Sequence, residues 1–97
     1  MNPVSVSNIQ ENSFTLNWQP YPTAESILIS CETNNTQFNF TDLYSNWGNS
    51  KVINSSLIPS IGPAQNYSCF VSAYNSTGII EISSTISFHS KKIFLLF

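Results

Sequence analysis

Hydrophobic and polar residues alternate in short runs along this chain, which is the pattern of strands that bury one face. In the clearest run, from Tyr67 to Ala73, every second residue is apolar and the residues between are mostly small and polar. Ile61, Gly62 and Pro63 precede this run and predict a sharp turn. We therefore expect a turn that leads into one long inner strand of an all-β domain.

Shorter runs of the same kind predict the other strands. We expect a first edge strand over residues 3–9, then strands over 13–18 and 26–32, a short fourth strand over 37–44, a fifth over 51–60 and a last strand over 81–90. Loops are expected at residues 20–24, 44–50 and 75–78, and Gly78 is free to adopt a positive φ. The register of the fifth strand stays open, because Val52, Ile53 and Leu57 do not follow one alternation.

Two motifs sharpen this prediction. The turn and the inner strand carry the set Ile61, Pro63, Gln65, Tyr67, Val71, Ala73, Asn75 and Gly78, and the second strand ends in Trp18, Gln19 and Pro20. These motifs resemble the fibronectin type III family, whose corner reads L-x-P-x-T-x-Y and continues x-V-x-V-x-A-x-N-x-x-G. Ile61 and Gln65 depart mildly from that pattern, and Cys69 replaces an aliphatic residue. The resemblance implies a seven-stranded antiparallel immunoglobulin-like β-sandwich with fibronectin type III topology.

The resemblance also implies structural roles for these residues. Tyr67 would pack inward at the corner while its hydroxyl bonds to upstream backbone. Trp18 would lie in the core, as the conserved place of such a residue in the family implies, and a binding role for it is the weaker alternative. The remaining residues assigned to the core and the tyrosine corner are Ile61, Pro63, Val71 and Ala73.

The two cysteines, Cys31 and Cys69, are an even count that suits one disulfide in an oxidising compartment. In the resembled fold the third and sixth strands are antiparallel neighbours, and both cysteines fall on the inward face. The resemblance therefore implies that the two thiols face each other and form a bridge. The alternative is a pair of buried free thiols that act as small hydrophobic side chains.

The length of 97 residues suits one domain, which we place over residues 1–97 with a core over about 3–88. The apolar tail over residues 91–97, KKIFLLF, has three interpretations: the beginning of a membrane span, an extension of the last strand, or a non-native end. Its five apolar residues fall far short of the roughly 20 that span a bilayer. The first residues lack the features of a signal peptide, so we expect Met1 to begin a piece of a longer protein.

The surface composition favours an extracellular or cell-surface location. Ser, Thr and Asn together make up 36 of the 97 residues, whereas charged residues are only 8%. Five N-x-S/T sequons are candidate glycosylation sites, of which chance accounts for about three. They begin at Asn34, Asn39, Asn54, Asn66 and Asn75. Together with the even cysteine count, they indicate a secreted protein or a protein that is anchored in a membrane elsewhere.

Residues that carry chemistry are few and dispersed. His89 is the one histidine, and no cluster with metal-ligand spacing accompanies it. The five acidic residues form no evident pair, and neither a nucleophile elbow nor a phosphate-binding loop occurs. The net charge of −2 gives no basic surface for nucleic acid. We therefore expect no enzyme, no cofactor, no metal site and no nucleic-acid partner.

The resemblance implies that the chain is a recognition module of a larger protein. Its expected function is adhesion or another protein interaction. The candidate binding loops are residues 20–24, 44–50 and 75–81, and Trp47, Asn75, Thr77 and Gly78 are their candidate contact residues. Trp47 either caps the core or stands exposed. The integrin-binding Arg-Gly-Asp and the W-S-x-W-S motif, each carried by some relatives, are absent. The alternative function is a passive spacer between neighbouring modules, and we expect the isolated domain to be a monomer.

Overall fold

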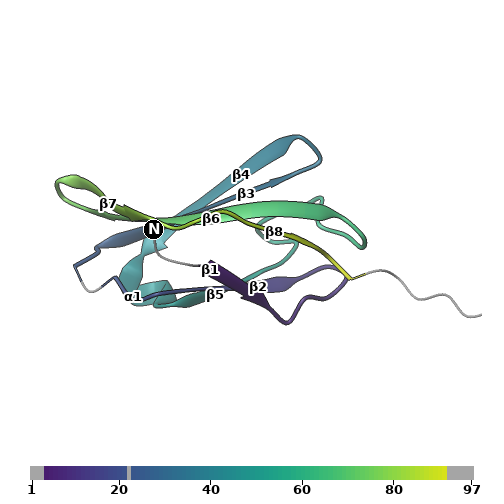
Figure 1. Cartoon of the computed structure of the whole chain (residues 1–97), viewed down its shortest axis with the longest axis horizontal. Coiled ribbons are helices and arrows are strands. Elements are labelled where there is room, and N and C mark those ends of the chain that lie inside the picture. The colour runs from purple at the N-terminus through teal and green to yellow at the C-terminus, as the bar shows by residue number, and fades with distance from the viewer. Residues whose placement is uncertain (1–3, 22, 92–97) are drawn as a thin grey trace, which may run out of the picture.

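The computed structural model describes residues 4–21 and 23–91 as two packed antiparallel sheets (Figure 1). The smaller sheet has the order β1 (Val4–Ser7), β2 (Phe14–Trp18) and β5 (Ser50–Ile53). The larger sheet has β4 (Thr36–Leu43) at one edge, then β3 (Ser26–Thr33) and β6 (Asn66–Asn75). Two strands, β7 (Gly78–Ile82) and β8 (Ile86–His89), both pair with β6 on its far side. This arrangement confirms the predicted fold class. The predictions for Pro3 and for the tail beyond Lys91 lie outside the described residues.

The core lies between the sheets, where the alternation of each strand places its apolar residues. Phe14, Leu16 and Trp18 of β2 face the alternate residues Ile27 and Ile29 of β3, and all five are buried. An aromatic group closes the core near the start of β6. The ring of Phe14 lies 5.0 Å from that of Tyr67 and 4.7 Å from that of Phe88, measured between centroids. Burial of these side chains is what holds the two sheets together.

The tip of the β3–β4 hairpin shows why the fourth strand begins one residue earlier than predicted, at Thr36. Asn34 and Asn35 have φ values of 52° and 62°, which is the backbone of a type I′ turn and suits Asn. Such a turn continues both strands without a splay. β4 therefore pairs with β3 along eight residues, from Thr36 opposite Thr33 to Leu43 opposite Ser26. The predicted range of 37–44 is therefore correct to within one residue at each end, although a strand of eight residues is not short.

The predicted loop over 44–50 contains a helical turn, α1 (Tyr44–Trp47). Its first turn is fixed by Asp42, whose carboxylate accepts hydrogen bonds from the Asn46 side chain at 2.8 Å and from the Leu43 N–H at 2.7 Å. These two bonds hold the pKa of the Asp42 carboxyl below its usual range, and the bond from Asn46 has the larger effect. Among the described residues, no helix has the length and apolar character that crossing a bilayer requires.

The fifth strand ends much earlier than predicted, at Ile53 instead of residue 60. Asn54 causes this, because its side-chain oxygen accepts from both the N–H and the hydroxyl of Ser56 and so forms a turn. The backbone oxygen of Asn54 also accepts from the N–H groups of Leu57 and Ile58. The chain thereby leaves the sheet, yet Ile58 remains buried in the core as expected.

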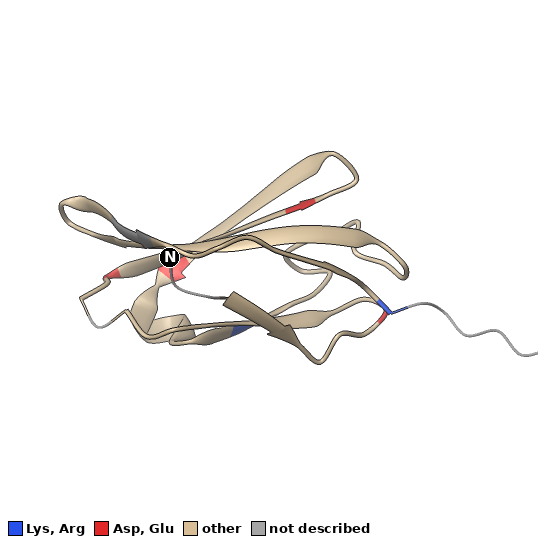
Figure 2. Cartoon of the chain, viewed as in Figure 1, with Lys and Arg blue, Asp and Glu red and all other residues tan. Residues whose placement is uncertain are grey.

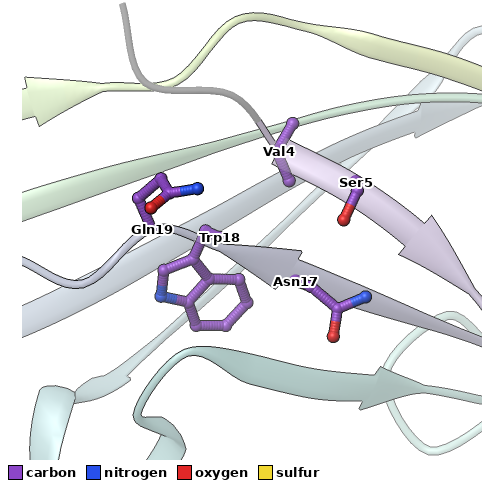
Figure 3. Close-up of a pocket in the computed structure, with 5 residues that line it drawn as sticks. All are labelled: Val4, Ser5, Asn17, Trp18 and Gln19. Atoms are coloured by element: carbon purple, nitrogen blue, oxygen red, sulfur yellow. The ribbon is translucent and has the colours of Figure 1, made fainter.

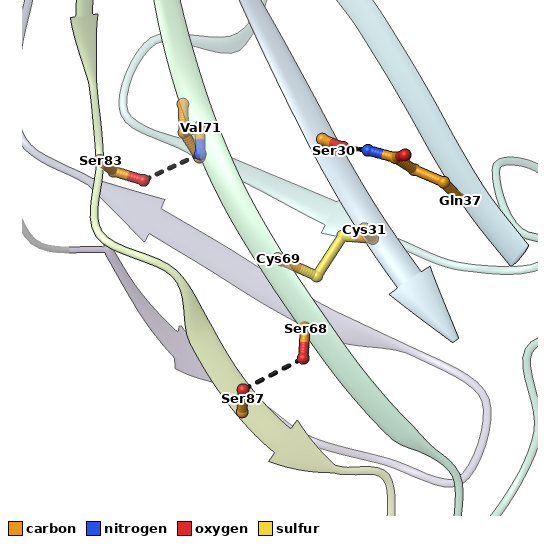
Figure 4. Close-up of a disulfide and its surroundings, with 8 residues drawn as sticks. All are labelled: Ser30, Cys31, Gln37, Ser68, Cys69, Val71, Ser83 and Ser87. Atoms are coloured by element: carbon orange, nitrogen blue, oxygen red, sulfur yellow. Dashed lines mark hydrogen bonds between the residues drawn. A yellow bond between two sulfur atoms is a disulfide. The ribbon is translucent and has the colours of Figure 1, made fainter. Parts of the chain in front are cut away.

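The last predicted strand, over 81–90, is in fact interrupted between β7 and β8. Ser83 replaces part of the ladder: its N–H donates to the Val71 oxygen at 2.8 Å, and its hydroxyl accepts from the Val71 N–H at 2.9 Å (Figure 4). The register shifts across this point, because Ser72 is opposite Ile82 whereas Cys69 is opposite Ile86. Ile82 consequently faces outward while Ile86 faces the core, although a continuous strand would put both on one face.

Candidate interaction surface

The three candidate loops meet at one end of the sandwich, and Glu25 connects them. The Glu25 N–H donates to the Tyr74 oxygen at 2.8 Å, and its own backbone oxygen accepts from the Tyr44 N–H at 3.0 Å. Its carboxylate accepts from the Ser76 N–H at 3.2 Å. Figure 1 shows α1 and the β6–β7 turn at this same end. No pattern in the sequence predicts this connecting role, because Glu25 is an isolated acidic residue in a loop.

Aromatic side chains fix the shape of the α1 segment. The Tyr44 hydroxyl accepts from the Tyr21 N–H at 3.0 Å and donates to the Asn49 side chain at 2.8 Å. The Trp18 indole N–H donates to the Gly48 oxygen at 2.9 Å, so the core reaches directly into this loop. These contacts leave the loop little freedom, which lowers the entropy lost when a partner binds.

Trp47 packs against the core and is partly buried. Of the two alternatives expected for this residue, capping of the core and full exposure, the structure therefore has the first. The Lys51 ammonium lies 5.5 Å from the centroid of its ring, within the range of a cation–π contact. Asn75, Thr77 and Gly78 form the turn between β6 and β7, where Gly78 has a φ of 125°. Thr77 and Gly78 are exposed.

The larger sheet carries exposed apolar side chains on its outer face. Cross-strand pairing puts Leu43 opposite Ser26, Ser26 opposite Tyr74, and Tyr74 opposite Ile79. Leu43 and Ile79 are 56% and 59% exposed, and Ile82 in the next row is 41% exposed. We define the outer patch as these three residues with their partly buried outward-facing neighbours, Leu28, Phe70 and Tyr74. Contiguous exposed apolar residues of this kind mark interaction sites more often than isolated ones do.

Charge is sparse around the outer patch. On the outward positions of β3, β4 and β6 the structure describes one ionised residue, Glu32, at the far end of the sheet from the loops. Figure 2 shows the charged residues of the described chain scattered singly over the molecule. Among the described residues, no group of three His, Cys, Asp or Glu side chains could hold a metal ion. The patch therefore suits an apolar partner surface, with little electrostatic contribution.

Hollows in the surface do not offer a small-molecule site of the usual kind. Figure 3 shows one of about 220 Å³ at the edge of β1 and β2, lined by Val4, Ser5, Asn17, Trp18 and Gln19. A second, of about 200 Å³, lies on the larger sheet beside Phe70. Both are below the roughly 300 Å³ at which ligand pockets begin. A third hollow, of about 370 Å³, is lined almost wholly by polar side chains near Asn34 and Asn66.

Cys31 and Cys69 are joined by a disulfide between neighbouring strands of the larger sheet (Figure 4). They are directly opposite each other on β3 and β6, their Cα atoms are 4.1 Å apart, and both are fully buried. At the tyrosine corner, the Gly62 N–H donates to the Tyr67 hydroxyl at 3.5 Å, and this hydroxyl donates to the Gln65 side chain at 3.1 Å. Burial raises the pKa of Tyr67 above its usual value.

The other residues singled out from the sequence divide between core, corner and surface. Trp18, Val71 and Ala73 are buried, Ile61 is partly buried against the core, and Pro63 is exposed at the corner. His89 is exposed at the end of β8. The sequons at Asn34, Asn39, Asn54 and Asn66 have exposed asparagines, whereas Asn75 is partly exposed.

The outer patch was not predicted from the sequence. Strand pairing creates it, because each patch residue lies across the sheet from another outward residue. The apolar Leu43 next to the charged Asp42 at the end of a strand was the available signal. Ile79 and Ile82 carried none, since their direction depends on the register shifts of β7.

The two sheets and their strand order place this chain among the immunoglobulin-like β-sandwiches. No family model matches the sequence, and no match was found among curated proteins. Solved structures do match it. A fibronectin type III domain of human contactin 1 is 19% identical, with a TM-score of 0.75 over 96% of this chain and 79% of that one. The fibronectin type III domain of the human collagen alpha-1(XX) chain is 11% identical, with a TM-score of 0.73 over 95% and 81%.

A third structure, of a myokine, is 15% identical with a TM-score of 0.75, and the match covers 94% of this chain and 96% of that one. At such low identities these likenesses establish the fold and nothing more. The chain therefore has the fold of a fibronectin type III domain, as its tyrosine corner and Trp18 implied.

Proposed function

We propose that this domain is a non-catalytic, extracellular protein-interaction module, and that the outer patch is where its partner docks. The observation that carries the proposal is the exposure of Leu43, Ile79 and Ile82 on the outer face of the larger sheet, beside the connected loops and away from Glu32. Rigid loops and a sheet with exposed apolar residues supply a surface that is already in its binding shape. The partner is a protein with a complementary apolar surface and few charges.

An extracellular location is supported by the disulfide and the low charge, and the five sequons agree with it. Within the same proposal, the chain is one module of a longer secreted or membrane-anchored protein. It needs neither a cofactor nor a metal, and it acts by binding a protein rather than by catalysis or by contact with nucleic acid.

The alternative, a passive spacer, is favoured by the positions of the two chain ends. Val4 is opposite Trp18 at the loop end, whereas the Lys91 N–H donates to the Gln10 oxygen at the other end. Figure 1 shows that β1 begins nearer to α1 than β8 ends, along the long axis of the molecule. Modules linked in series through such ends would be held apart by the length of the sandwich.

A binding comparison separates the two functions. The domain, secreted by eukaryotic cells and presented as a multimer to raise avidity, is tested against an array of extracellular proteins. The Leu43→Ser and Ile79→Ser double variant should lose binding by at least about tenfold, because it removes apolar contacts at the centre of the site. The matched control is Val52→Ser, since Val52 is 52% exposed on β5 of the opposite sheet.

The control variant should bind as the unchanged domain does. A partner that binds the double variant as tightly as the unchanged domain would refute the assignment of the patch. If the unchanged domain binds nothing above the level of a fibronectin type III domain without such a patch, the spacer function is the correct one.

A further inference from the structure

Two of the five sequons form turns of the same kind, at two separate places in the chain. The side-chain oxygen of Asn54 accepts from the Ser56 N–H at 3.0 Å and from the Ser56 hydroxyl at 2.6 Å. The side-chain oxygen of Asn75 accepts from the Thr77 N–H at 2.9 Å and from the Thr77 hydroxyl at 2.6 Å. In both places the hydroxyl of the sequon lies against the amide of its own asparagine. Asn54 is exposed just after β5, and Asn75 is the partly exposed last residue of β6, opposite Gly78.

This geometry matters for attachment of an N-linked glycan. In that reaction the asparagine Nδ2 forms a bond to C1 of a sugar carried on a lipid-diphosphate-linked oligosaccharide. The bond from C1 to the phosphate oxygen breaks, the lipid diphosphate leaves with the electron pair, and Nδ2 gives up one proton to a base of the transferase. The amide nitrogen is a weak nucleophile because its lone pair is delocalised into the carbonyl.

The turn prepares the asparagine for this step in two ways. The bonds to Oδ1 fix the side chain in one orientation, so less entropy is lost when the transferase binds it. They also leave Nδ2 without a hydrogen-bond partner among the described residues at both Asn54 and Asn75, so no protein contact has to be broken to reach the nitrogen.

The sequons on strands differ because their residues are held in the sheet. Asn66 is opposite His89, and its sequon hydroxyl residue, Ser68, lies in a strand that is paired on both sides. The Ser68 hydroxyl also shares a hydrogen bond of 3.1 Å with Ser87 (Figure 4). Asn39 lies in the middle of β4, where it is opposite Ser30. A transferase could bind these segments only if strand pairing were broken.

Asn34 resembles the strand sequons more than the turn sequons. It lies at the tip of the β3–β4 hairpin with a positive φ of 52°, and its hydroxyl residue, Thr36, is already paired with Thr33. The orientation that the transferase needs is therefore blocked by the hairpin itself.

We propose that Asn54 and Asn75 accept N-linked glycans in the folded domain, whereas Asn34, Asn39 and Asn66 accept them only before β3, β4 and β6 have paired. This inference rests on the proposed extracellular function, since that places the chain in a compartment where the transferase acts. It divides five sequons of identical motif into two classes by the backbone that carries them.

The test is transfer in vitro to the full 97-residue chain. The chain is produced without glycans in an oxidising bacterial compartment and supplied, folded, to a purified oligosaccharyltransferase with its lipid-linked donor. The same chain, reduced, alkylated and unfolded, is treated in parallel, and a short acceptor peptide verifies that the enzyme is active. Occupancy at each asparagine is measured by mass spectrometry of peptides over time.

In the folded chain we expect Asn54 and Asn75 to be modified at least about tenfold faster than Asn34, Asn39 and Asn66, and in the unfolded chain this difference should disappear. Equal rates at all sites in the folded chain would overturn the proposal, as would a folded chain in which Asn54 and Asn75 stay unmodified. The assay contains no binding partner. Its failure therefore leaves the interaction proposal standing, and a failure of the patch variants leaves this one standing.

Discussion

Removing the disulfide is the perturbation whose effect on stability can be worked out most fully. Cys31 and Cys69 are separated by 38 residues in the chain and are directly opposite each other on β3 and β6. In the chain-entropy account, closing a loop of that length stabilises the folded state by about 4 kcal/mol, because the cross-link restricts the unfolded chain. Single domains are stable by about 5 to 15 kcal/mol, so the loss would be a large share of the total.

Two forms of the protein separate the cross-link from the packing of the sulfur atoms. The reduced protein keeps both sulfurs in place and loses only the bond. The Cys31→Ala and Cys69→Ala double variant also loses the buried sulfur volume, which adds a cavity cost to the entropic one. The variant should therefore be less stable than the reduced protein, and both should be less stable than the oxidised protein.

Urea unfolding followed by tryptophan fluorescence measures these differences, since Trp18 is buried in the core. With a slope of about 2 kcal/mol per molar urea, a loss of about 4 kcal/mol lowers the midpoint by about 2 M. Equal midpoints for the oxidised and reduced proteins would refute the reasoning. So would alkylation of both thiols in the unfolded, unreduced chain, because the bond would then be absent.

Three further predictions concern single side chains. Tyr67→Phe should lower the free energy of unfolding by about 1 kcal/mol, because its hydrogen bonds are lost. Burial raises the pKa of Tyr67, so the stability of the wild type falls as pH rises above about 10. Urea unfolding of the variant at several pH values should show less of that fall. Ser83→Ala should cost about 1 to 3 kcal/mol, since it leaves the Val71 N–H without its acceptor, while Ser83→Thr restores most of it in thermal unfolding. Asp42→Asn should reduce the fall in the free energy of unfolding at acid pH. Hydrogen bonds, above all the one from Asn46, lower the pKa of Asp42, so the carboxylate stabilises the fold above about pH 4 and this stabilisation is lost as pH falls. A wild-type protein whose stability does not fall in this range would count against the prediction.

The parts of the fold that the sequence predicted are those with unbroken alternation. Trp18 and Tyr67 were placed correctly because every second residue of β2 and of the run from Tyr67 to Ala73 is apolar, and each strand ends or begins at a recognisable motif. The facing positions of Cys31 and Cys69 followed from the strand order that the resemblance implied. In each case one local pattern and one global pattern gave the same answer.

Errors arose where a side chain takes over a backbone hydrogen bond. Asn54 ends the fifth strand by bonding Ser56, and the Ser83 hydroxyl replaces a ladder acceptor between β7 and β8. Neither residue changes the apolar pattern, so periodicity cannot show the break. Polar chains rich in Ser and Asn therefore hide their strand ends more than other chains do.

The candidate surface was predicted only in part. Turn residues indicated where the three loops lie, although residues 44–47 form α1 and residues 78–81 belong to β7. The connection of the loops through Glu25 depends on contacts between distant segments. The outer patch depends on register across three strand pairs, which the sequence does not give. Trp47, the residue that looked most suited to binding, is instead packed partly against the core.

The most direct test of the interaction proposal is site-specific photo-crosslinking. A photoreactive amino acid replaces Ile79 in the outer patch or Val52 on the opposite sheet, two positions of similar exposure. The modified chains are incubated with cells that carry the candidate partner and are then irradiated. We predict a discrete partner adduct from position 79 that is absent from position 52 and is suppressed by Leu43→Ser in the same chain. The same adducts from both positions, or none from position 79, would contradict the account.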